Sequence, residues 1–237
     1  MIISFKYKFI FIKNYKTAGS SIESYLYTYL TNRDIIAPTE DTKGINSWGE
    51  FDQKSLLKYF DNNIAQKYIN LSLAFFPHMP IWLVKERLKP LSQRLGYDIF
   101  NNFYKFAVIR NPYDLIVSDY YWQNNCENTL RTNQSFEQIL TDIINNKQST
   151  YRLLNFNRLM DRELKNILCD RIIKFENLNV EINELFKKLN IPFNGKLEIY
   201  KKKSKNKKNS KNFYNYKSKK IIKKIFRKEI ELFKYDI

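Results

Sequence analysis

Four side chains have the chemical character needed to hold and transfer an anionic group: Lys16, His78, Arg110 and Ser118. The charges of Lys16 and Arg110 can stabilise phosphate or sulfate oxygens, and a guanidinium can donate two parallel hydrogen bonds to them. His78 is the only histidine of the chain, and an imidazole titrates near neutrality, as a general base should. Each residue also has a structural interpretation. A lone histidine is usually structural or exposed, Arg110 could form a surface ion pair, and Ser118 could be a small packing residue.

Lys16 belongs to a loop between an expected strand and an expected helix. The apolar run Phe9–Ile12 is typical of a buried strand, and large side chains recur at helical spacing over residues 22–30. Between them, Lys16-Thr17-Ala18-Gly19-Ser20-Ser21 leaves free N–H groups at the helix N-terminus, which can bind phosphate or sulfate. Gly19 allows the backbone to approach the anion closely. The loop is not a Walker A motif, because its lysine precedes the glycine.

His78 and Arg110 also follow expected strands. We interpret residues 71–76 as a strand, with a helix end as the alternative, and this segment stops at Pro77-His78-Met79-Pro80. The run Tyr104–Ile109 predicts a buried strand, and Arg110-Asn111-Pro112 then begins a helix that carries Ser118. The polar stretch 31–50 is interpreted as a surface loop. Short helical pieces are expected over residues 51–60 and 65–69, helices over 81–95, 112–122, 135–145 and 182–189, and a mixed helical region over 151–168.

Strands near residues 9–12, 71–76, 104–109 and 172–175, alternating with helices, predict an α/β fold. We expect a three-layer architecture in which helices flank a mostly parallel sheet. Ligands of such sheets bind beyond the carboxyl ends of the strands. Because Lys16, His78 and Arg110 each follow such an end, we predict that they meet at one edge of the sheet.

The composition predicts a single globular domain over residues 1–237. Hydrophobic residues make up 43% of the chain and aromatic residues 16%, whereas 5 glycines and 6 prolines argue against long flexible linkers. Cys126 and Cys169 are expected to be reduced thiols, and we expect no metal, since His and Cys show no ligand spacing. The apolar N-terminal run is interpreted as one strand rather than a signal peptide. We therefore expect a soluble, cytoplasmic protein.

Positive charge is concentrated near the end of the sequence. The chain has a net charge of +17, and residues 196–237 contain 16 Lys and Arg but only 4 Asp and Glu, a net +12. The lysine-rich stretch at about 200–212 is most simply a solvated loop, and a closing helix is expected at about 217–233. Such a basic segment suggests an anionic partner: cofactor phosphates, an acidic glycan, nucleic acid or a membrane surface.

The motifs resemble those of sulfotransferases that use 3′-phosphoadenosine 5′-phosphosulfate (PAPS). The loop from Lys16 to Ser21 resembles their 5′-phosphosulfate loop, and YKFAVIRNPYDLIVSDYYW, residues 104–122, resembles the 3′-phosphate motif as the carbohydrate sulfotransferase family has it. His78-Met79-Pro80 matches a His-x-(Ser/Pro) segment of that family. The segments 171–178 and 228–237 resemble its Phe-Glu-Asn-Leu and closing elements, so the likeness spans nearly the whole chain. Tyr15 and Lys234 depart from it, at positions where the family usually has proline and glycine.

The resemblance implies a P-loop NTPase-like sulfotransferase fold and transfer of a sulfuryl group from PAPS to a carbohydrate hydroxyl. His78 would be the general base, and Lys16 would stabilise charge on the transferring group and the leaving phosphate. The expected cofactor-binding residues are Lys16, Thr17, Ala18, Gly19, Ser20, Ser21, Arg110 and Ser118. No metal is required.

Two other function classes are compatible with parts of the sequence. A nucleic-acid-binding protein could use the basic tail, but no helix-turn-helix, zinc-finger or RNA-recognition signature accompanies the charge. A nucleotide kinase would share the fold class, but the order of the Walker A motif is missing. Affinity for adenosine 3′,5′-bisphosphate (PAP), the product of PAPS, separates the three classes.

Overall fold

A five-stranded sheet forms the centre of the computed structural model. The structure describes residues 1–31, 33–37, 75–125, 135–145, 153–197 and 210–236. The strands are β1 (Ile2–Ser4), β2 (Phe9–Ile12), β3 (Ile35–Ile36), β4 (Tyr104–Ile109) and β5 (Arg171–Lys174). Their order in the sheet is β3-β1-β2-β4-β5. β2, β4 and β5 are parallel, whereas β1 pairs antiparallel with both β2 and β3.

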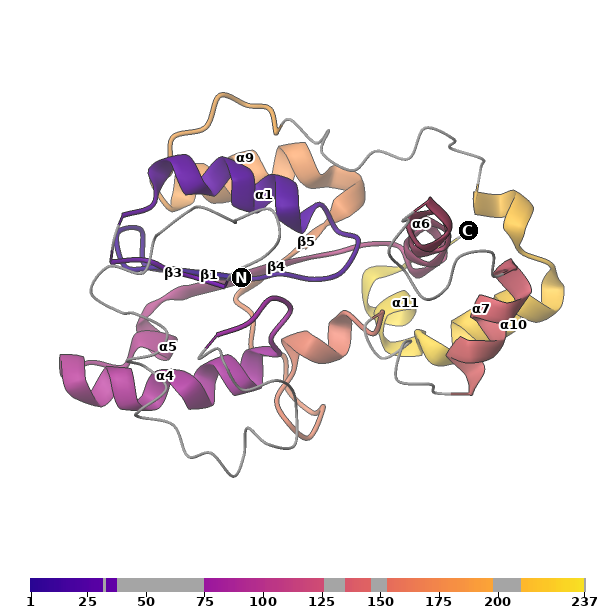
Figure 1. Ribbon diagram of the computed structural model, residues 1–237, viewed down its shortest axis with the longest axis horizontal. Helices are drawn as coiled ribbons and strands as arrows, with labels where there is room; N and C mark the ends of the chain where they lie inside the picture. The colour runs from indigo at the N-terminus through magenta and orange to yellow at the C-terminus, as the bar shows by residue number, and fades with distance from the viewer. Residues whose placement is uncertain (32, 38–74, 126–134, 146–152, 198–209, 237) are drawn as a thin grey trace.

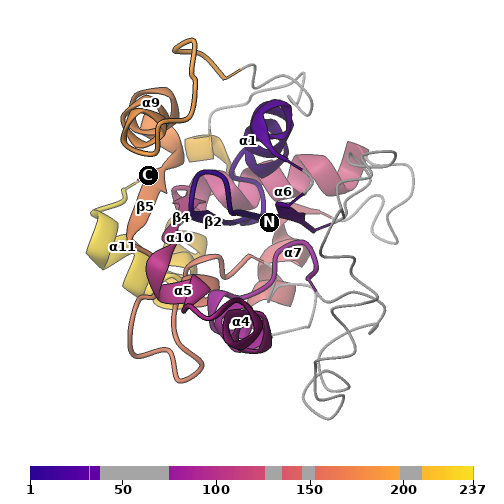
Figure 2. The same cartoon turned by 90° about the vertical axis from the view of Figure 1, so that its left-hand side faces the viewer.

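Both faces of the central strands are buried. Phe9 and Phe11 of β2 pack on one face, and Ile10 and Ile12 pack on the other, as the two-residue period of a strand requires. Such a sheet needs helices on both sides. In Figures 1 and 2, α1 (Gly19–Leu26) and α9 (Leu178–Lys188) cover one face, and α4 (Ile81–Leu95) and α5 (Ile99–Asn102) cover the other.

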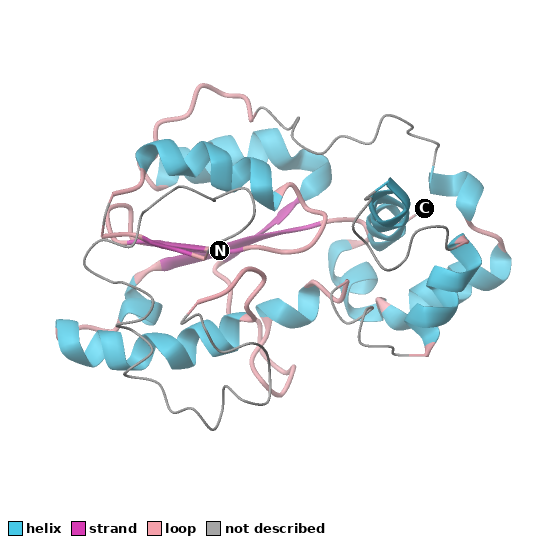
Figure 3. Cartoon of the chain, viewed as in Figure 1, coloured by secondary structure: helices cyan, strands magenta, loops and turns pink. Residues whose placement is uncertain are grey.

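A second group of helices lies beyond the carboxyl ends of the parallel strands. It consists of α6 (Pro112–Asn125), α7 (Phe136–Ile144), α10 (Tyr216–Ile225) and α11 (Arg227–Phe233), which enclose an apolar core of their own. Figure 3 shows this group beside the sheet layers, with α6 entering it directly from β4. The described residues also form four short helical turns, η1 (Tyr27–Tyr29), η3 (Phe156–Leu159), η4 (Phe175–Asn177) and η5 (Ser210–Phe213). No helix in the described part of the chain is long and apolar enough to cross a membrane.

The structure confirms the predicted α/β fold, with helices on both faces of the sheet. β2 and β4 have the predicted bounds, and β5 begins one residue earlier than expected. The helices expected over 81–95, 112–122, 135–145 and 182–189 correspond to α4, α6, α7 and α9. The helices expected over 51–60 and 65–69, and residues 200–209 of the lysine-rich stretch, lie outside the described residues. So does most of the strand expected over 71–76; its last two residues, Phe75 and Phe76, are not in a strand.

Some predicted elements were wrong. The N-terminal run forms two strands joined by a turn, and Ile35–Ile36 adds an edge strand where a surface loop was expected. Between residues 153 and 168 only η3 is helical, because the Asp161 carboxylate accepts the N–H groups of Lys165 and Asn166 and closes a turn instead. The closing helix is broken into α10 and α11 at Phe226, whose backbone leaves the helical conformation while its ring is buried.

Candidate functional site

The loop between β2 and α1 has an unusual backbone that its neighbours hold in place. Lys16 and Ala18 adopt left-handed conformations, with φ of 58° and 60°, which cost about 1–2 kcal/mol each for residues other than glycine. The Asn14 side-chain amide donates a hydrogen bond to the Val108 carbonyl of β4 at 2.9 Å. The loop is therefore tied to the adjacent parallel strand.

The end of this loop presents N–H groups at the start of α1. The N–H groups of Ser21 and Ile22 donate hydrogen bonds to the Ala18 carbonyl, at 3.0 and 3.1 Å. Those of Gly19 and Ser20 precede them, in the first turn, where a helix supplies no acceptor. This end of the helix also carries partial positive charge, so it suits an anion.

Gly19 is required because the Lys13 side chain passes directly beneath it. A Cβ at position 19 would lie 2.7 Å from Lys13 Cγ. Lys13 Nζ forms a buried ion pair with Glu23 of α1 at 2.5 Å, and the terminal ammonium of Met1 contacts the same carboxylate at 2.5 Å. Lys13 and Glu23 could not be predicted from the sequence, since nothing in their spacing shows that both are buried.

His78 lies beside this loop, with one ring nitrogen bound to it. Its Nδ1 is 3.0 Å from the Lys13 carbonyl. Because a carbonyl only accepts, Nδ1 carries the proton and Nε2 is left with its lone pair. Burial, followed by the charges of Lys13, the terminal ammonium and Arg158, holds the pKa of His78 well below its usual range. The imidazole is therefore neutral at pH 7, the form in which a general base acts.

Arg110 reaches the same loop from the end of β4. Its Nη1 donates to the Lys16 carbonyl at 3.3 Å, and its guanidinium lies 4.4 Å from the centre of the Phe175 ring. Its buried Nε has no acceptor among the described residues. Burial lowers the pKa of Arg110, although Asp114 and Glu176 favour the charged form. Because the pKa of an arginine starts far above neutrality, the side chain is still charged at pH 7. A buried charged donor without a partner is costly, and an anionic ligand would supply the missing acceptor.

Helix α6 borders the other side of the loop. Lys16 Nζ lies 5.2 Å from the centre of a Trp122 ring. Ser118 lies one turn before Trp122 and is half-buried, so it belongs to the same face of the helix. The structure thus gathers Lys16, His78 and Arg110 around one loop and places Ser118 on the helix face beside it. Their individual roles stay predictions.

The last described residues fasten the strand ends next to Arg110. The Asn111 side-chain amide donates to the Asp236 carbonyl at 2.6 Å, and Lys174 Nζ donates to the Phe233 carbonyl at 2.8 Å. The Asn111 N–H donates to the Glu176 carboxylate at 2.7 Å. These contacts, which we call the C-terminal closure, hold together the carboxyl ends of β4 and β5. They involve the segment 228–237, which resembles the closing element of the family.

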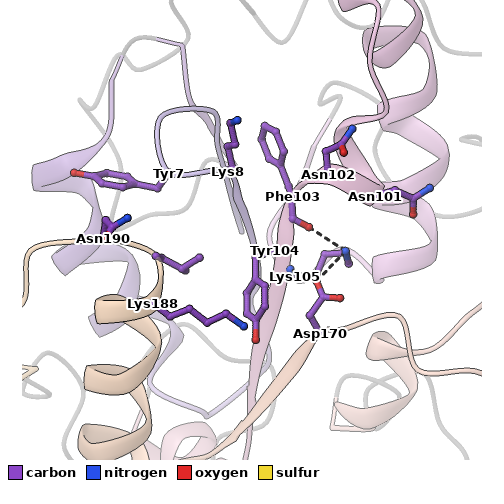
Figure 4. A pocket seen from close by; sticks show the side chains of 11 residues that line it. Tyr7, Lys8, Asn101, Asn102, Phe103, Tyr104, Lys105, Asp170, Lys188 and Asn190 are labelled. Atoms are coloured by element: carbon purple, nitrogen blue, oxygen red, sulfur yellow. Dashed lines mark hydrogen bonds and ion pairs between the residues drawn. The ribbon is translucent and has the colours of Figure 1, made fainter.

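A cavity of about 390 Å³ lies at the opposite edge of the sheet, near the amino ends of the parallel strands. Figure 4 shows its lysines. Lys105 Nζ donates to two main-chain carbonyls, those of Phe100 and Phe103, and pairs with Asp170 at 2.8 Å, while Lys188 Nζ lies 4.1 Å from the centre of the Tyr104 ring. Because Lys105 and Lys188 already have these partners, we place the candidate site at the carboxyl edge.

Comparisons with known proteins identify the fold. No protein-family model matches the sequence. An uncharacterized protein of Archaeoglobus fulgidus is 28% identical over 116 residues, which cover 48% of this chain and 84% of that protein. Among solved structures, that of mouse sulfotransferase SULT7A1 complexed with PAP is similar with a TM-score of 0.50 and 13% sequence identity, over 96% of this chain and 85% of that chain. This likeness confirms the predicted sulfotransferase fold, whereas membership of the carbohydrate sulfotransferase family stays a prediction.

Proposed function

We propose that this protein is a sulfotransferase that moves a sulfuryl group from PAPS to a carbohydrate hydroxyl. The observation that carries the proposal is the assembly around the loop after β2. Arg110 and His78 both bind main-chain carbonyls of that loop, and the buried Arg110 Nε has no acceptor among the described residues. The similar mouse structure, which contains PAP, supports the same ligand class.

The residues at this edge fit the two anionic ends of PAPS. Lys16 and the first N–H groups of α1 would hold the phosphosulfate, since both offer positive charge and donors in one loop. Arg110 would bind the 3′-phosphate through its guanidinium, with Ser118 adding a hydroxyl. The motif resemblance supports this division, because it assigns the two phosphate groups to the same two segments.

The transfer requires a base on the acceptor side and positive charge on the leaving side. Nε2 of His78 would take the proton of the acceptor hydroxyl as its oxygen bonds to sulfur. Lys16 and the loop N–H groups would stabilise the negative charge that gathers on the leaving phosphate when its bond to sulfur breaks. The proton on Nδ1 stays bound to the Lys13 carbonyl, which keeps Nε2 as the acceptor throughout.

The proposal of a carbohydrate acceptor rests on two motifs that resemble those of carbohydrate sulfotransferases, namely His78-Met79-Pro80 and the closing element. The basic segment near the end of the chain also suits an acidic glycan.

Two measurements test the proposal. Calorimetric titration should show micromolar or tighter binding of PAP and much weaker binding of ATP. Incubation with ³⁵S-labelled PAPS and a panel of glycans should label at least one of them. Preference for ATP would indicate a kinase, and affinity for an oligonucleotide without affinity for PAP would indicate a nucleic-acid-binding protein; either result overturns the proposal.

A further inference from the structure

Tyr15 covers one face of the candidate base. Its ring and the His78 imidazole have centres 3.7 Å apart and planes inclined by 10°. The Arg158 guanidinium lies 4.8 Å from the centre of the same Tyr15 ring. Since the imidazole occupies one face of the tyrosine at stacking distance, the other face is left for the guanidinium. Tyr15 is thus held in a stack between a neutral ring and a cation.

A buried asparagine fixes the backbone of Tyr15. Asn155 Oδ1 accepts the Tyr15 N–H at 3.0 Å, and Asn155 Nδ2 donates to the Tyr15 carbonyl at 2.9 Å. Asn155 is 1% exposed and directly precedes η3, which carries Arg158. Both the main chain and the ring of Tyr15 are therefore held by one short segment, 140 residues away in the sequence.

The bond to the Tyr15 N–H depends on the residue type. A proline at this position would have no N–H to donate and would lose half of the Asn155 contact. It would also lack the flat ring on which His78 lies. The departure from the motif at position 15 therefore coincides with two contacts that the usual proline could not make.

His78 has few other restraints on the orientation of its ring. Its backbone is left-handed, with φ of 61°, and its ring hydrogen bond to the described part of the chain is the one from Nδ1 to the Lys13 carbonyl. A histidine side chain rotates about two bonds, and a single hydrogen bond at Nδ1 leaves part of that rotational freedom. The stacked tyrosine removes that freedom.

We propose that Tyr15 is a positioning residue for His78, and that Asn155 and Arg158 act through it. The stack sets the plane of the imidazole, so that Nδ1–H meets the Lys13 carbonyl and Nε2 has one fixed direction. The inference deepens the proposed function, because the direction of Nε2 matters for a base that must meet an acceptor hydroxyl. The charged groups that face His78 are Lys13, Arg158 and the terminal ammonium of Met1.

The single histidine makes a direct test feasible. A two-bond ¹H–¹⁵N correlation spectrum of the imidazole observes His78 alone. The wild-type protein should show the Nδ1–H tautomer at pH 7. Tyr15→Leu, which removes the ring, should give a mixture of tautomers and a pKa that moves up towards the ordinary histidine value, because water then reaches the imidazole. Tyr15→Phe, which keeps the ring, should restore the wild-type spectrum.

Kinetics supply the second arm of the test. Tyr15→Leu should lower kcat by about ten-fold with little change in PAP affinity, and Tyr15→Phe should restore the rate. Tyr216→Leu, at an 83% exposed tyrosine, is the matched control and should change neither the spectrum nor the rate. If Tyr15→Leu does not fold, Asn155→Asp, which loses the donor to the Tyr15 carbonyl, should shift the same NMR signals.

The outcomes distinguish this inference from the proposed function. An unchanged His78 spectrum in folded Tyr15→Leu and Asn155→Asp proteins would overturn the positioning role, whatever the activity. If the variants change the His78 spectrum but the wild-type protein transfers no sulfate, the positioning role is supported and the proposed function is overturned.

Discussion

His78 is half-buried and neutral, and these two properties decide its pH behaviour. The low pKa of its imidazole means that the base form persists until the pH falls well below 6.5. We therefore expect kcat to stay level from pH 8 to pH 6.5 and to fall only in more acidic solution. His78→Asn, whose amide can still donate to the Lys13 carbonyl, should lower kcat by about 10²–10⁴-fold, the range for a lost general base, and should abolish the acidic limb.

PAP affinity is the control for the His78 experiment, because His78 is not expected to bind the cofactor. Calorimetry should give nearly equal dissociation constants for the wild-type and His78→Asn proteins. Full sulfate transfer by a folded variant would show that another group takes the proton.

Arg110 should contribute to binding of the 3′-phosphate alone. Arg110→Ala removes a charge-assisted donor, and PAP affinity should fall by about 2–3 kcal/mol, or roughly 30–150-fold. The affinity for the analogue without the 3′-phosphate should barely change. Arg171→Ala is the matched control, since Arg171 begins β5 at the other edge and pairs with Glu184 at 2.7 Å. Equal losses of affinity for both ligands would show that Arg110 acts on folding rather than on the 3′-phosphate.

At the scale of elements, the junction of β2 and α1 has no room for a side chain at position 19. Gly19→Ala would push a methyl group against Lys13 Cγ, which is 2.7 Å away and belongs to a buried ion pair. We expect a loss of about 1–3 kcal/mol in the free energy of unfolding, the usual cost of overpacking. Urea denaturation measures it, with Ser24→Ala on the same helix as the control. A change below 0.5 kcal/mol, roughly the level of an ordinary surface substitution, would show that the loop adapts.

Helix α11 carries a buried carboxyl group that should make stability depend on pH. Burial raises the pKa of Glu229 from 4.5 to about 8, although the Phe156 N–H donates to it at 3.2 Å. Between these two values the folded protein holds a proton that the unfolded chain has lost, so stability should fall as the pH rises from about 5 to 8. Glu229→Gln stays neutral and keeps an acceptor, so it should have the higher Tm at pH 8 and a similar Tm at pH 5. Parallel Tm profiles over this range would contradict the shift.

The sequence predicted the elements whose signals are local. The apolar runs of β2 and β4 and the periodic helices α4 and α9 follow from the spacing of their side chains. The short β3 could not be predicted, because two isoleucines give no period and depend on pairing with β1. Lys234 stands where the family usually has glycine, so the sequence does not show that the turn is kept. The structure gives Lys234 a φ of 53°, a conformation that glycine adopts without cost, so the turn persists without the glycine.

The charged residues of the candidate site could be predicted from the sequence, but the buried polar residues that hold them in place could not. Lys16, His78 and Arg110 stand at ends of strong apolar or proline-bounded segments, and α/β topology brings such ends together. Asn14 and Asn155 are buried polar residues whose partners lie far along the chain, and the buried Glu23 pairs with Lys13 and the terminal ammonium. Their contacts come from tertiary structure, so no motif or period in one sequence shows them.

For the whole molecule, the net charge of +17 should speed the capture of anionic ligands. Helix α10 contributes exposed lysines and contains no acidic residue. We expect kcat/KM to fall steeply as salt is raised from about 20 to 200 mM, because the Debye length then shortens. Lys220→Glu with Lys224→Glu should flatten this dependence more than Lys187→Glu with Lys188→Glu on α9. Equal salt profiles for the two double variants would mean that only total charge matters.

The C-terminal closure has a consequence for synthesis on the ribosome. The contacts of Asn111 and Lys174 with residues 236 and 233 cannot form until nearly all of the described chain has left the exit tunnel. Contacts so distant in sequence form slowly even in a free chain. A nascent chain can therefore assemble its sheet while the ends of β4 and β5 are still unfastened, and we expect stalled chains that stop before residue 233 to fold without retaining PAP. Binding competence would then mark the completion of translation through this segment, rather than the folding of the sheet.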